Sequence, residues 1–243
     1  MPVDSSRIQA LNERHSGSTA EEIVRATLEI EPRAILACSL GIEDTVLLHI
    51  LSAEAGKLGL KPRGFVLDTG RLPEECYAAL EDCRQKYGDV LEIFFPEAQA
   101  VEKLVRAKGP YSFYESVENR KECCRIRKVE PLKRALSGSL AWITGLRREQ
   151  SVTRADTPLF ELDETHGGIL KVNPLSNWTE KMVYDYAAAN NVPVNSLHRK
   201  GFPSIGCEPC TRAVEPGEDV RAGRWWWENA AQKECGLHIK DNG

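Results

Sequence analysis

The fold is decided by residues 33–53, which read RAILACSLGIEDTVLLHILSA. The apolar run at the start of this stretch is typical of a short buried strand. A polar turn at residues 39–44 follows, and an apolar helix begins at Thr45. A strand, a tight turn and a helix in this order bring backbone N–H groups and the positive end of a helix dipole together. The stretch therefore predicts an anion-binding turn, in which Ser39 adds a hydroxyl and Gly41 permits close backbone approach.

The alternation of strand and helix continues along the chain. Further strands are predicted at residues 64–67, 90–95, 140–144, 158–162 and 169–172, and helices at residues 20–30, 73 onward, 98–107, 118–129, 131–136 and 177–190. This order predicts an α/β fold, a mostly parallel twisted sheet with helices on both faces. Ligands bind such sheets at the carboxyl ends of the strands. The turn at residues 39–44 and the segment Asp68–Gly70 are expected there.

Two pairs of cysteines form a candidate metal site. Cys123 and Cys124 are adjacent in a basic run, and Cys207 and Cys210 form a C-x-x-C pair. A disulfide between neighbours would be strained, because adjacent Cα atoms lie about 3.8 Å apart and a disulfide prefers roughly 4.4–6.8 Å. Adjacent thiolates also suit a single zinc ion poorly, whereas in an iron–sulfur cluster each can bind a different iron. We favour an iron–sulfur cluster on these four thiols; a zinc ion, or a chance pair packed in a helix, is the alternative.

Cationic residues are clustered near the expected site. Lys128 follows Cys124 by four residues, so on a helix the two side chains are neighbours. It would offset the negative charge of the thiolates and reach an anionic substrate. The loop after the strand at 140–144 carries three arginines, Arg147, Arg148 and Arg154, which suit phosphate or sulfate. Solvated helix faces are the alternative explanation of these clusters.

Composition excludes several classes of protein. The 243 residues carry a formal net charge of −4, which argues against a general nucleic-acid binder. No apolar run approaches the roughly 18 residues of a membrane span, and the first residues do not form a secretory signal. Eight cysteines without an export signal indicate a reducing compartment, so we expect a cytoplasmic protein.

Three parts of the chain are expected. Residues 1–18 are polar and predicted to be loosely ordered, residues 19–214 form the nucleotide- and cluster-binding α/β domain, and residues 215–243 form a C-terminal catalytic tail. The tail contains tryptophans at 225–227, which either dock it onto the core or form a partner surface. It also contains Cys235, a candidate nucleophile whose thiolate His238 or Lys233 would stabilise; an incidental thiol near the C-terminus is the alternative.

Six segments together carry a resemblance to a known family. They are SLGIED (39–44), LDTG (67–70), KECC (121–124), GLRR (145–148), GCEPCTR (206–212) and ECGLH (234–238). In this order they resemble the assimilatory sulfonucleotide reductases, and in particular the adenosine 5'-phosphosulfate (APS) reductases that contain a [4Fe-4S] cluster. Relatives that act on the 3'-phosphorylated nucleotide (PAPS) typically lack both cysteine pairs, so APS is the favoured substrate.

The resemblance implies a function and a set of residue roles. The fold would be adenine-nucleotide alpha-hydrolase-like, and the reaction would reduce APS to sulfite and AMP in sulfate assimilation and cysteine biosynthesis. Cys235 would form an S-sulfocysteine, which thioredoxin or a similar dithiol protein would reduce, with Lys128 and His238 assisting. The substrate would contact Ser39, Gly41, Glu43, Asp44, Leu67, Asp68, Thr69, Gly70, Arg147, Arg148, Arg221 and Arg224. A homo-oligomer is expected, without nucleic acid or membrane.

Alternative functions are PAPS reduction, an ATP-pyrophosphatase-type enzyme such as a tRNA thiolase, and a non-catalytic metal-binding sensor. A thiolase would be expected to have a turn richer in glycine and a basic surface for RNA. A sensor would need neither Cys235 nor the arginine loop.

Overall fold

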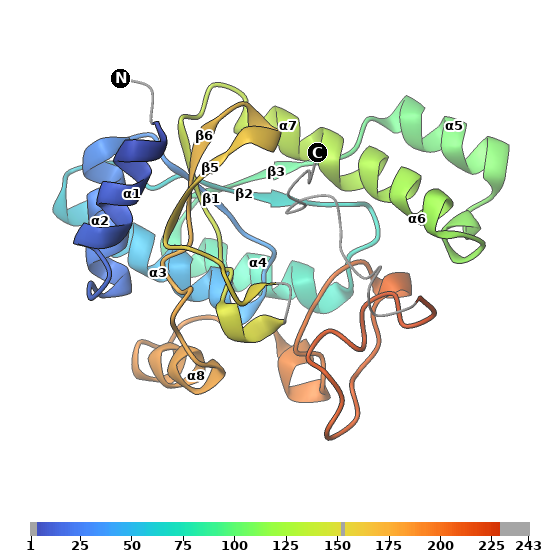
Figure 1. Cartoon of the computed structure of the whole chain (residues 1–243). Helices are drawn as coiled ribbons and strands as arrows, with labels where there is room; N and C mark the ends of the chain where they lie inside the picture. Colours follow the sequence, from blue (N-terminus) through green and yellow to red (C-terminus); the bar gives the residue numbers. More distant parts are fainter. Residues whose placement is uncertain (1–3, 152–153, 229–243) are drawn as a thin grey trace.

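The computed structural model describes residues 4–151 and 154–228 of the chain. Its centre is a sheet of six strands in the order β3-β2-β1-β4-β6-β5 (Figure 1). The strands are β1 (Ile35–Ala37), β2 (Gly64–Leu67), β3 (Leu91–Phe94), β4 (Ala141–Ile143), β5 (Phe160–Asp163) and β6 (Ile169–Val172). Neighbouring strands are parallel except β5 and β6, which are antiparallel. The predicted, mostly parallel α/β fold is confirmed.

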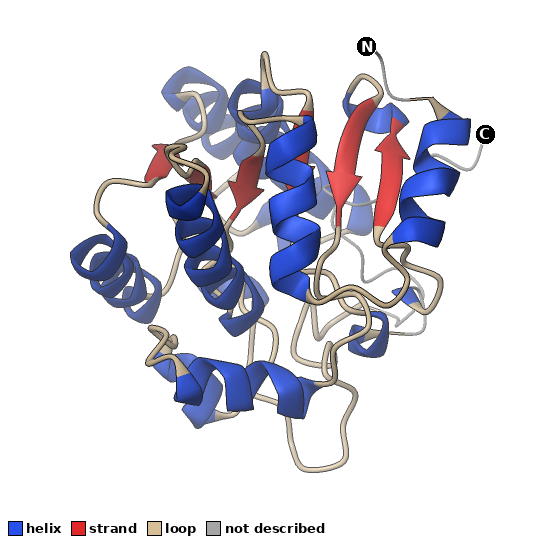
Figure 2. Cartoon of the chain, turned by 90° about the vertical axis from the view of Figure 1, so that its left-hand side faces the viewer, coloured by secondary structure: helices blue, strands red, loops and turns tan. Residues whose placement is uncertain are grey.

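Helices lie on both sides of this sheet (Figure 2). They are α1 (Ser5–Arg14), α2 (Ala20–Ile30), α3 (Ile42–Lys57), α4 (Glu74–Tyr87), α5 (Ala98–Lys108), α6 (Val117–Cys124), α7 (Glu130–Leu136) and α8 (Glu180–Ala189). None of the helices in the described ranges is long and apolar enough to cross a membrane.

The strands separate two buried apolar clusters. Successive side chains of a strand point to opposite faces of the sheet. In β4, Trp142 therefore joins a cluster that contains Leu132 and Leu136 of α7. Ala141 and Ile143 join the larger cluster, to which α2, α3, α4 and α8 contribute. Both faces of β4 are covered, which explains why its sequence is continuously apolar.

The sheet has a topological switch point at β1. The chain passes from β1 to β2 and β3 on one side, and β4 then pairs with β1 on the other side. Connections that diverge from neighbouring parallel strands leave a crevice at the carboxyl ends of those strands. Leu40, in the turn after β1, is buried with a φ of 64°, a strained backbone conformation for leucine that a defined turn must hold in place.

The N-terminal segment differs from the prediction. Residues 5–14 form α1, which Asp4 caps by accepting a hydrogen bond from the Arg7 N–H. The Asn12 amide donates to the Phe160 carbonyl and accepts from the Phe160 N–H, so it pairs with the outer edge of β5. The prediction of loose order is wrong here, because one polar side chain fastens the helix to the sheet.

Two helix details also differ. The helix predicted at residues 177–190 begins at Glu180, because the Thr179 hydroxyl caps α8 by accepting from the Met182 N–H. The predicted continuous helix at 118–129 changes after Cys124 into a π-helical turn, Arg125–Val129. Such turns are rare in proteins, and those that occur are often found at functional sites.

Candidate functional site

A cavity of about 220 Å³ lies at the carboxyl ends of β1, β2 and β4. The predicted substrate-binding and catalytic residues that line it are Ser39, Gly41, Glu43, Asp44, Leu67, Thr69, Lys128, Arg221 and Arg224. They come from four separate segments of the chain. The fold therefore brings most of the predicted substrate residues within the described ranges around one space.

The turn after β1 is already hydrogen-bonded within the protein. Asp44 accepts from the Ser39 N–H at 2.7 Å and from the Ser39 hydroxyl at 2.5 Å. The Ile42 N–H, at the start of α3, donates to His198 Nε2 at 3.0 Å. Burial raises the pKa of Asp44 to about 6, although the Ser39 bonds oppose that rise. The donors that were expected to bind an anion at Ser39 and Ile42 thus serve the turn itself.

Cationic side chains, rather than the donors of the turn after β1, are available in the wall of the cavity. Among the described residues, the lysine and arginine side chains in its wall are Lys128, Arg154, Arg221 and Arg224. They contribute positive charge to a partly enclosed space, where charges interact more strongly than in bulk water. This wall is suited to a small multiply charged anion.

Close backbone approach shapes the floor of the cavity. Gly145, directly after β4, lies so near α3 that an added Cβ would collide with Asp44 and would come within 2.9 Å of the Glu43 Cβ. The Gly145 N–H also bonds Asp44 and lowers the pKa of that carboxyl, against the larger effect of burial. A glycine is required here because the loop after β4 packs directly against the first turn of α3.

Two predicted arginines do not line the cavity. Arg147 is almost fully buried, and it donates from Nε to Glu43 Oε1 and from Nη1 to Glu149 Oε2, each at 3.0 Å. Arg148 donates to the Thr157 carbonyl and to Asn177 Oδ1. Arg147 thus holds Glu43, which does line the cavity. A substrate contact for either arginine stays a prediction.

Asp68 and Gly70 flank Thr69, which lines the cavity. Asp68 is buried and accepts from the Gly70 N–H at 2.8 Å and from the Tyr77 hydroxyl at 3.0 Å. Gly70 has a φ of 68°, and an added Cβ would lie 3.4 Å from Arg127 Nη1. Neither residue lines the cavity, and their predicted substrate contacts are not tested by this arrangement.

Sequence reasoning missed His198, which contributes to the cavity wall beside α3. Burial lowers its pKa, and Nε2 accepts from Ile42, so the ring is neutral with its proton on Nδ1. A single histidine in a loop gave no local signal. Arg154 also lines the cavity, and only its place in the arginine-rich loop pointed to it.

The four predicted metal ligands surround a second, much smaller cavity. Cys123, Cys124, Cys207 and Cys210 line a space of about 10 Å³ and belong to one buried cluster. The first pair ends α6 and the second flanks the short turn Glu208–Cys210, so the fold joins thiols that are more than eighty residues apart in sequence. In the ranges 4–151 and 154–228, no group of three or more His, Cys, Asp and Glu side chains is arranged to hold a metal ion.

The surroundings of the thiols fit a negatively charged group. Arg71, Arg120, Arg127 and Lys128 line the same small cavity. Arg71 Nη1 and Arg127 Nε are buried without a hydrogen-bond partner, an arrangement that costs free energy unless an acceptor is present. An iron–sulfur cluster with four thiolates carries negative charge and accepts hydrogen bonds at sulfur. The donor set and its cations therefore suit such a cluster.

The nearby cations and burial have opposite effects on the pKa values of the thiols. Burial would raise the pKa of Cys207, but Lys128, the Thr69 hydroxyl and two arginines outweigh it and lower that pKa. Thr69 Oγ1 lies 3.2 Å from Cys207 Sγ. Burial dominates at Cys210 and raises its pKa to about 12. Cys207 is thus more ready than Cys123 and Cys210, whose pKa values burial raises, to exist as a thiolate.

The two cavities share a wall. Lys128 and Trp225 line both of them, and Thr69 lines the larger cavity while its hydroxyl contacts Cys207. Lys128 belongs to the π-helical turn that directly follows Cys124. The predicted proximity of Lys128 to the thiols is therefore present, in a turn wider than an α-helix.

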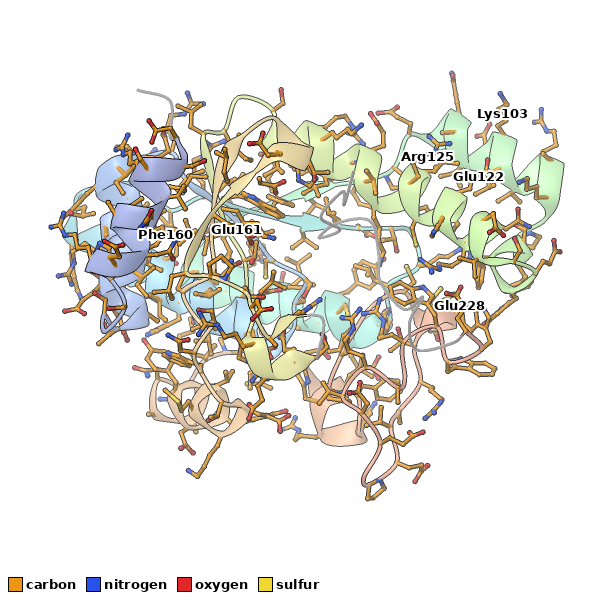
Figure 3. The ribbon with its side chains drawn as sticks, viewed as in Figure 1. Lys103, Glu122, Arg125, Phe160, Glu161 and Glu228 are labelled. Carbon is orange, nitrogen blue, oxygen red and sulfur yellow. The ribbon has the colours of Figure 1, made fainter. Side chains whose placement is uncertain are left out.

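The end of the described chain packs beside the thiols. Trp225 is buried, Trp227 lies 4.4 Å from the Tyr114 ring, and Trp226 is about half exposed. Glu228 forms a buried ion pair with Arg120 on the side of the molecule that carries α6 (Figure 3). The tryptophans therefore dock this segment onto the core. Cys235 and His238, the predicted nucleophile and its partner, lie outside the described residues.

The sheet order and the crevice at β1 define an α/β protein of the adenine-nucleotide alpha-hydrolase-like class. The family model described as "Phosphoadenosine phosphosulfate reductase domain" matches residues 33–213, so the chain belongs to that family. The match includes both cysteine pairs and ends before Arg221.

Curated relatives match over most of the chain. A Burkholderia cepacia protein named adenosine 5'-phosphosulfate reductase is 54% identical over 203 residues, which is 84% of this chain and 79% of the relative. A Sinorhizobium fredii protein of the same name is 46% identical over 233 residues, 96% of this chain and 91% of the relative. Among solved structures, a phosphoadenylyl-sulfate (PAPS) reductase from Candida auris in a phosphate complex has a TM-score of 0.73 and 27% identity, and covers 88% of this chain and 99% of its own.

Proposed function

We propose that this chain reduces adenosine 5'-phosphosulfate to sulfite and AMP, in assimilatory sulfate reduction and cysteine biosynthesis. The observation that carries the proposal is the shared wall between a cation-lined cavity at the switch point and a cavity lined by four buried cysteines. The curated relatives described above are named adenosine 5'-phosphosulfate reductase, which supports this substrate and reaction. A sensor would not need the cation-lined cavity, and a thiolase would be expected to have a turn richer in glycine than residues 39–44, which contain one glycine.

In the first step, APS lies in the larger cavity with its phosphosulfate against Lys128, Arg154, Arg221 and Arg224. The Cys235 thiolate attacks the sulfate sulfur, and the bond from that sulfur to the bridging oxygen breaks. AMP leaves with the oxygen and its electron pair, and Cys235 becomes an S-sulfocysteine. The cations stabilise the charge that develops on the departing phosphate, which is the electrostatic contribution expected of a preorganised site.

In the second step, a thiolate of a dithiol protein such as thioredoxin attacks Cys235 Sγ. Sulfite leaves with the electron pair of the sulfur–sulfur bond, and a mixed disulfide forms. The second thiol of the donor attacks that disulfide, which restores Cys235 and leaves the donor oxidised. Two electrons thus pass from the dithiol to sulfur, through two covalent intermediates on Cys235, the S-sulfocysteine and the mixed disulfide.

Cys123, Cys124, Cys207 and Cys210 would hold the [4Fe-4S] cluster. When bound, the cluster would supply fixed charge and structural support beside Lys128. Lys128 compensates the thiolates on one side and faces the substrate on the other. His238 would stabilise the Cys235 thiolate.

The direct test is anaerobic purification, followed by a sulfite assay with APS and thioredoxin. We expect a brown protein that releases sulfite and AMP in equal amounts. Cys235→Ser should abolish turnover and keep both the colour and AMP binding, while Cys83→Ser, which alters a buried thiol of α4, should keep turnover. A colourless protein that releases no sulfite would exclude the proposal, and activity in Cys235→Ser would exclude the assigned nucleophile.

PAPS reduction is the second candidate, because the matching family model and the solved relative from Candida auris are both named for it. Values of kcat/KM with APS and PAPS, measured on the same preparation, separate the two. We expect APS to be preferred. A preference for PAPS would reverse the substrate assignment and leave the reaction type intact.

A cytoplasmic location and a homo-oligomeric state are the remaining parts of the proposal. Light scattering coupled to size exclusion would determine the oligomeric state. A monomer at assay concentration would rule out the expected assembly without affecting the chemistry.

A further inference from the structure

Arg224 is held in the wall of the larger cavity by several contacts at once. Its side chain is buried, and Nη1 donates to the Ile205 carbonyl at 2.9 Å and to the Ser204 hydroxyl at 3.3 Å. Its Cζ lies 4.8 Å from the centre of the Trp225 ring. A long, flexible cation is thus fixed in one orientation before any ligand arrives.

Trp225 holds a second guanidinium on the same indole. The Cζ of Arg120 lies 4.7 Å from the ring centre, and Arg120 also forms the buried pair with Glu228. Trp225 is buried with a φ of 41°, a conformation that bulky residues rarely adopt. Backbone strain of this kind persists only where surrounding contacts hold it, and it clusters at functional sites.

Gly206 faces the same guanidinium. An ideal Cβ built on Gly206 would lie 2.5 Å from Arg224 Cζ and nearer still to Nη2. Real Cβ atoms essentially never come within 3.0 Å of a non-bonded atom of this kind. A methyl group at this position therefore displaces the guanidinium. The space that Arg224 occupies exists because residue 206 has no side chain.

We propose that Trp225 and Gly206 are positioning residues that set the Arg224 guanidinium in the cavity, where it binds the phosphate of an adenosine 5'-phosphate ligand. Trp225 contacts the guanidinium through its ring, and Gly206 leaves room beside it. The inference rests on the proposed nucleotide site and deepens it, because it states how that site presents its charge. Neither residue needs to contact the ligand.

The test compares AMP with adenosine, which lacks the phosphate. Binding of each is measured by calorimetry on the purified, metal-loaded protein and needs no turnover. In Gly206→Ala we expect the Kd for AMP to rise about tenfold, the loss of one charge-assisted hydrogen bond, with adenosine affinity unchanged. Gly56→Ala is the matched control, since its new methyl group has no neighbour within 4 Å, and it should bind both ligands as the parent does.

A double-variant comparison shows whether the effect passes through Arg224. Gly206→Ala should add nothing to the AMP affinity lost in Arg224→Met. Trp225→Leu should weaken AMP binding about fivefold, and Trp225→Phe, which keeps an aromatic face, should recover most of that loss. Iron content is measured on each variant, because Gly206 precedes Cys207.

The outcomes are distinct. Equal weakening of AMP and adenosine, or additive losses in the double variant, would overturn the positioning role. So would Trp225→Phe binding AMP as poorly as Trp225→Leu. If AMP does not bind the parent protein, the nucleotide site itself is wrong. Phosphate-selective loss in a protein that fails to reduce APS would keep this inference and reject the proposed reaction.

Discussion

The buried Arg120–Glu228 pair predicts a large loss of stability when one partner is neutralised. Arg120 donates from Nε to Glu228 Oε1 at 2.9 Å and from Nη2 to Oε2 at 2.7 Å. The exposed fractions of the two side chains are 1% and 4%. Glu228→Gln removes the negative charge and leaves one acceptor oxygen, so the Arg120 cation stays buried with half of its pairing.

Breaking a buried ion pair from one side costs about 3–5 kcal/mol, and we expect the lower end because glutamine still accepts one hydrogen bond. Arg212 and Glu218 offer a matched control. Their carboxylate accepts two bonds of 2.8 and 2.7 Å, but the side chains are 38% and 32% exposed. Glu218→Gln should therefore cost no more than about 1 kcal/mol. Both carboxylates accept two hydrogen bonds from one guanidinium, Arg120 using Nε and Nη2 and Arg212 using Nη1 and Nη2, so the main difference between the pairs is burial.

Urea unfolding under anaerobic conditions, followed by tryptophan fluorescence and by far-UV circular dichroism, measures both losses. Trp225 contacts Arg120 and reports on the segment itself. If only the C-terminal segment opens, the fluorescence transition moves to lower urea and precedes the dichroism transition. The reasoning fails if Glu228→Gln loses no more than Glu218→Gln by either signal.

Three further predictions concern buried groups at the site. Burial holds the pKa of Asp44 near 6 against an ordinary 3.8, so the folded protein keeps a proton there that the unfolded chain releases. The parent protein should therefore lose up to about 3 kcal/mol of unfolding free energy as the pH rises from 4 to 6. Asp44→Asn should lack that pH dependence in urea titrations. Burial lowers the pKa of His198, so its contribution is full above pH 6.5 and lost as pH falls; the stability difference between the parent and His198→Gln should shrink from pH 7.5 to 5.5. Cys207→Ser should lose iron and visible absorbance, while Cys76→Ser, an equally buried thiol away from the small cavity, should keep both; full iron in Cys207→Ser would contradict the ligand set.

The fold was predictable because its signals are local. Each predicted strand is a short, mainly apolar run, and each lies within a residue or two of the observed one, as at β2, Gly64–Leu67. Burial on both faces makes such runs continuously apolar. Cys76 and Cys83 lie seven residues apart in the helix predicted from residue 73, and both are buried in α4. The short helix α1 was not predicted, because Asn12 stabilises it by hydrogen-bonding to an edge strand almost 150 residues away in sequence.

The site was predictable in part. The cysteine pairs and the turn after β1 stand out as motifs, and the fold brings each set together. Spacing alone did not distinguish the arginines of one loop. Arg147 turns inward to Glu43, whereas Arg154, seven residues on, lines the cavity. The difference depends on where Glu43 lies after folding, which no local pattern records.

Lys128 shows how one residue serves two sites. A lysine four residues after a ligand on a regular α-helix would sit directly above that ligand. The π-helical turn Arg125–Val129 adds a residue to the helical repeat just after Cys124, and Lys128 lines the larger cavity as well as the smaller cavity lined by the cysteines. Its charge lowers the pKa of Cys207 on one side of the wall and faces the expected anion on the other. A change of charge at either cavity therefore alters the electrostatic environment of the other without any movement of the backbone. The π-helical turn makes this coupling possible because it places Lys128 in the wall of both cavities.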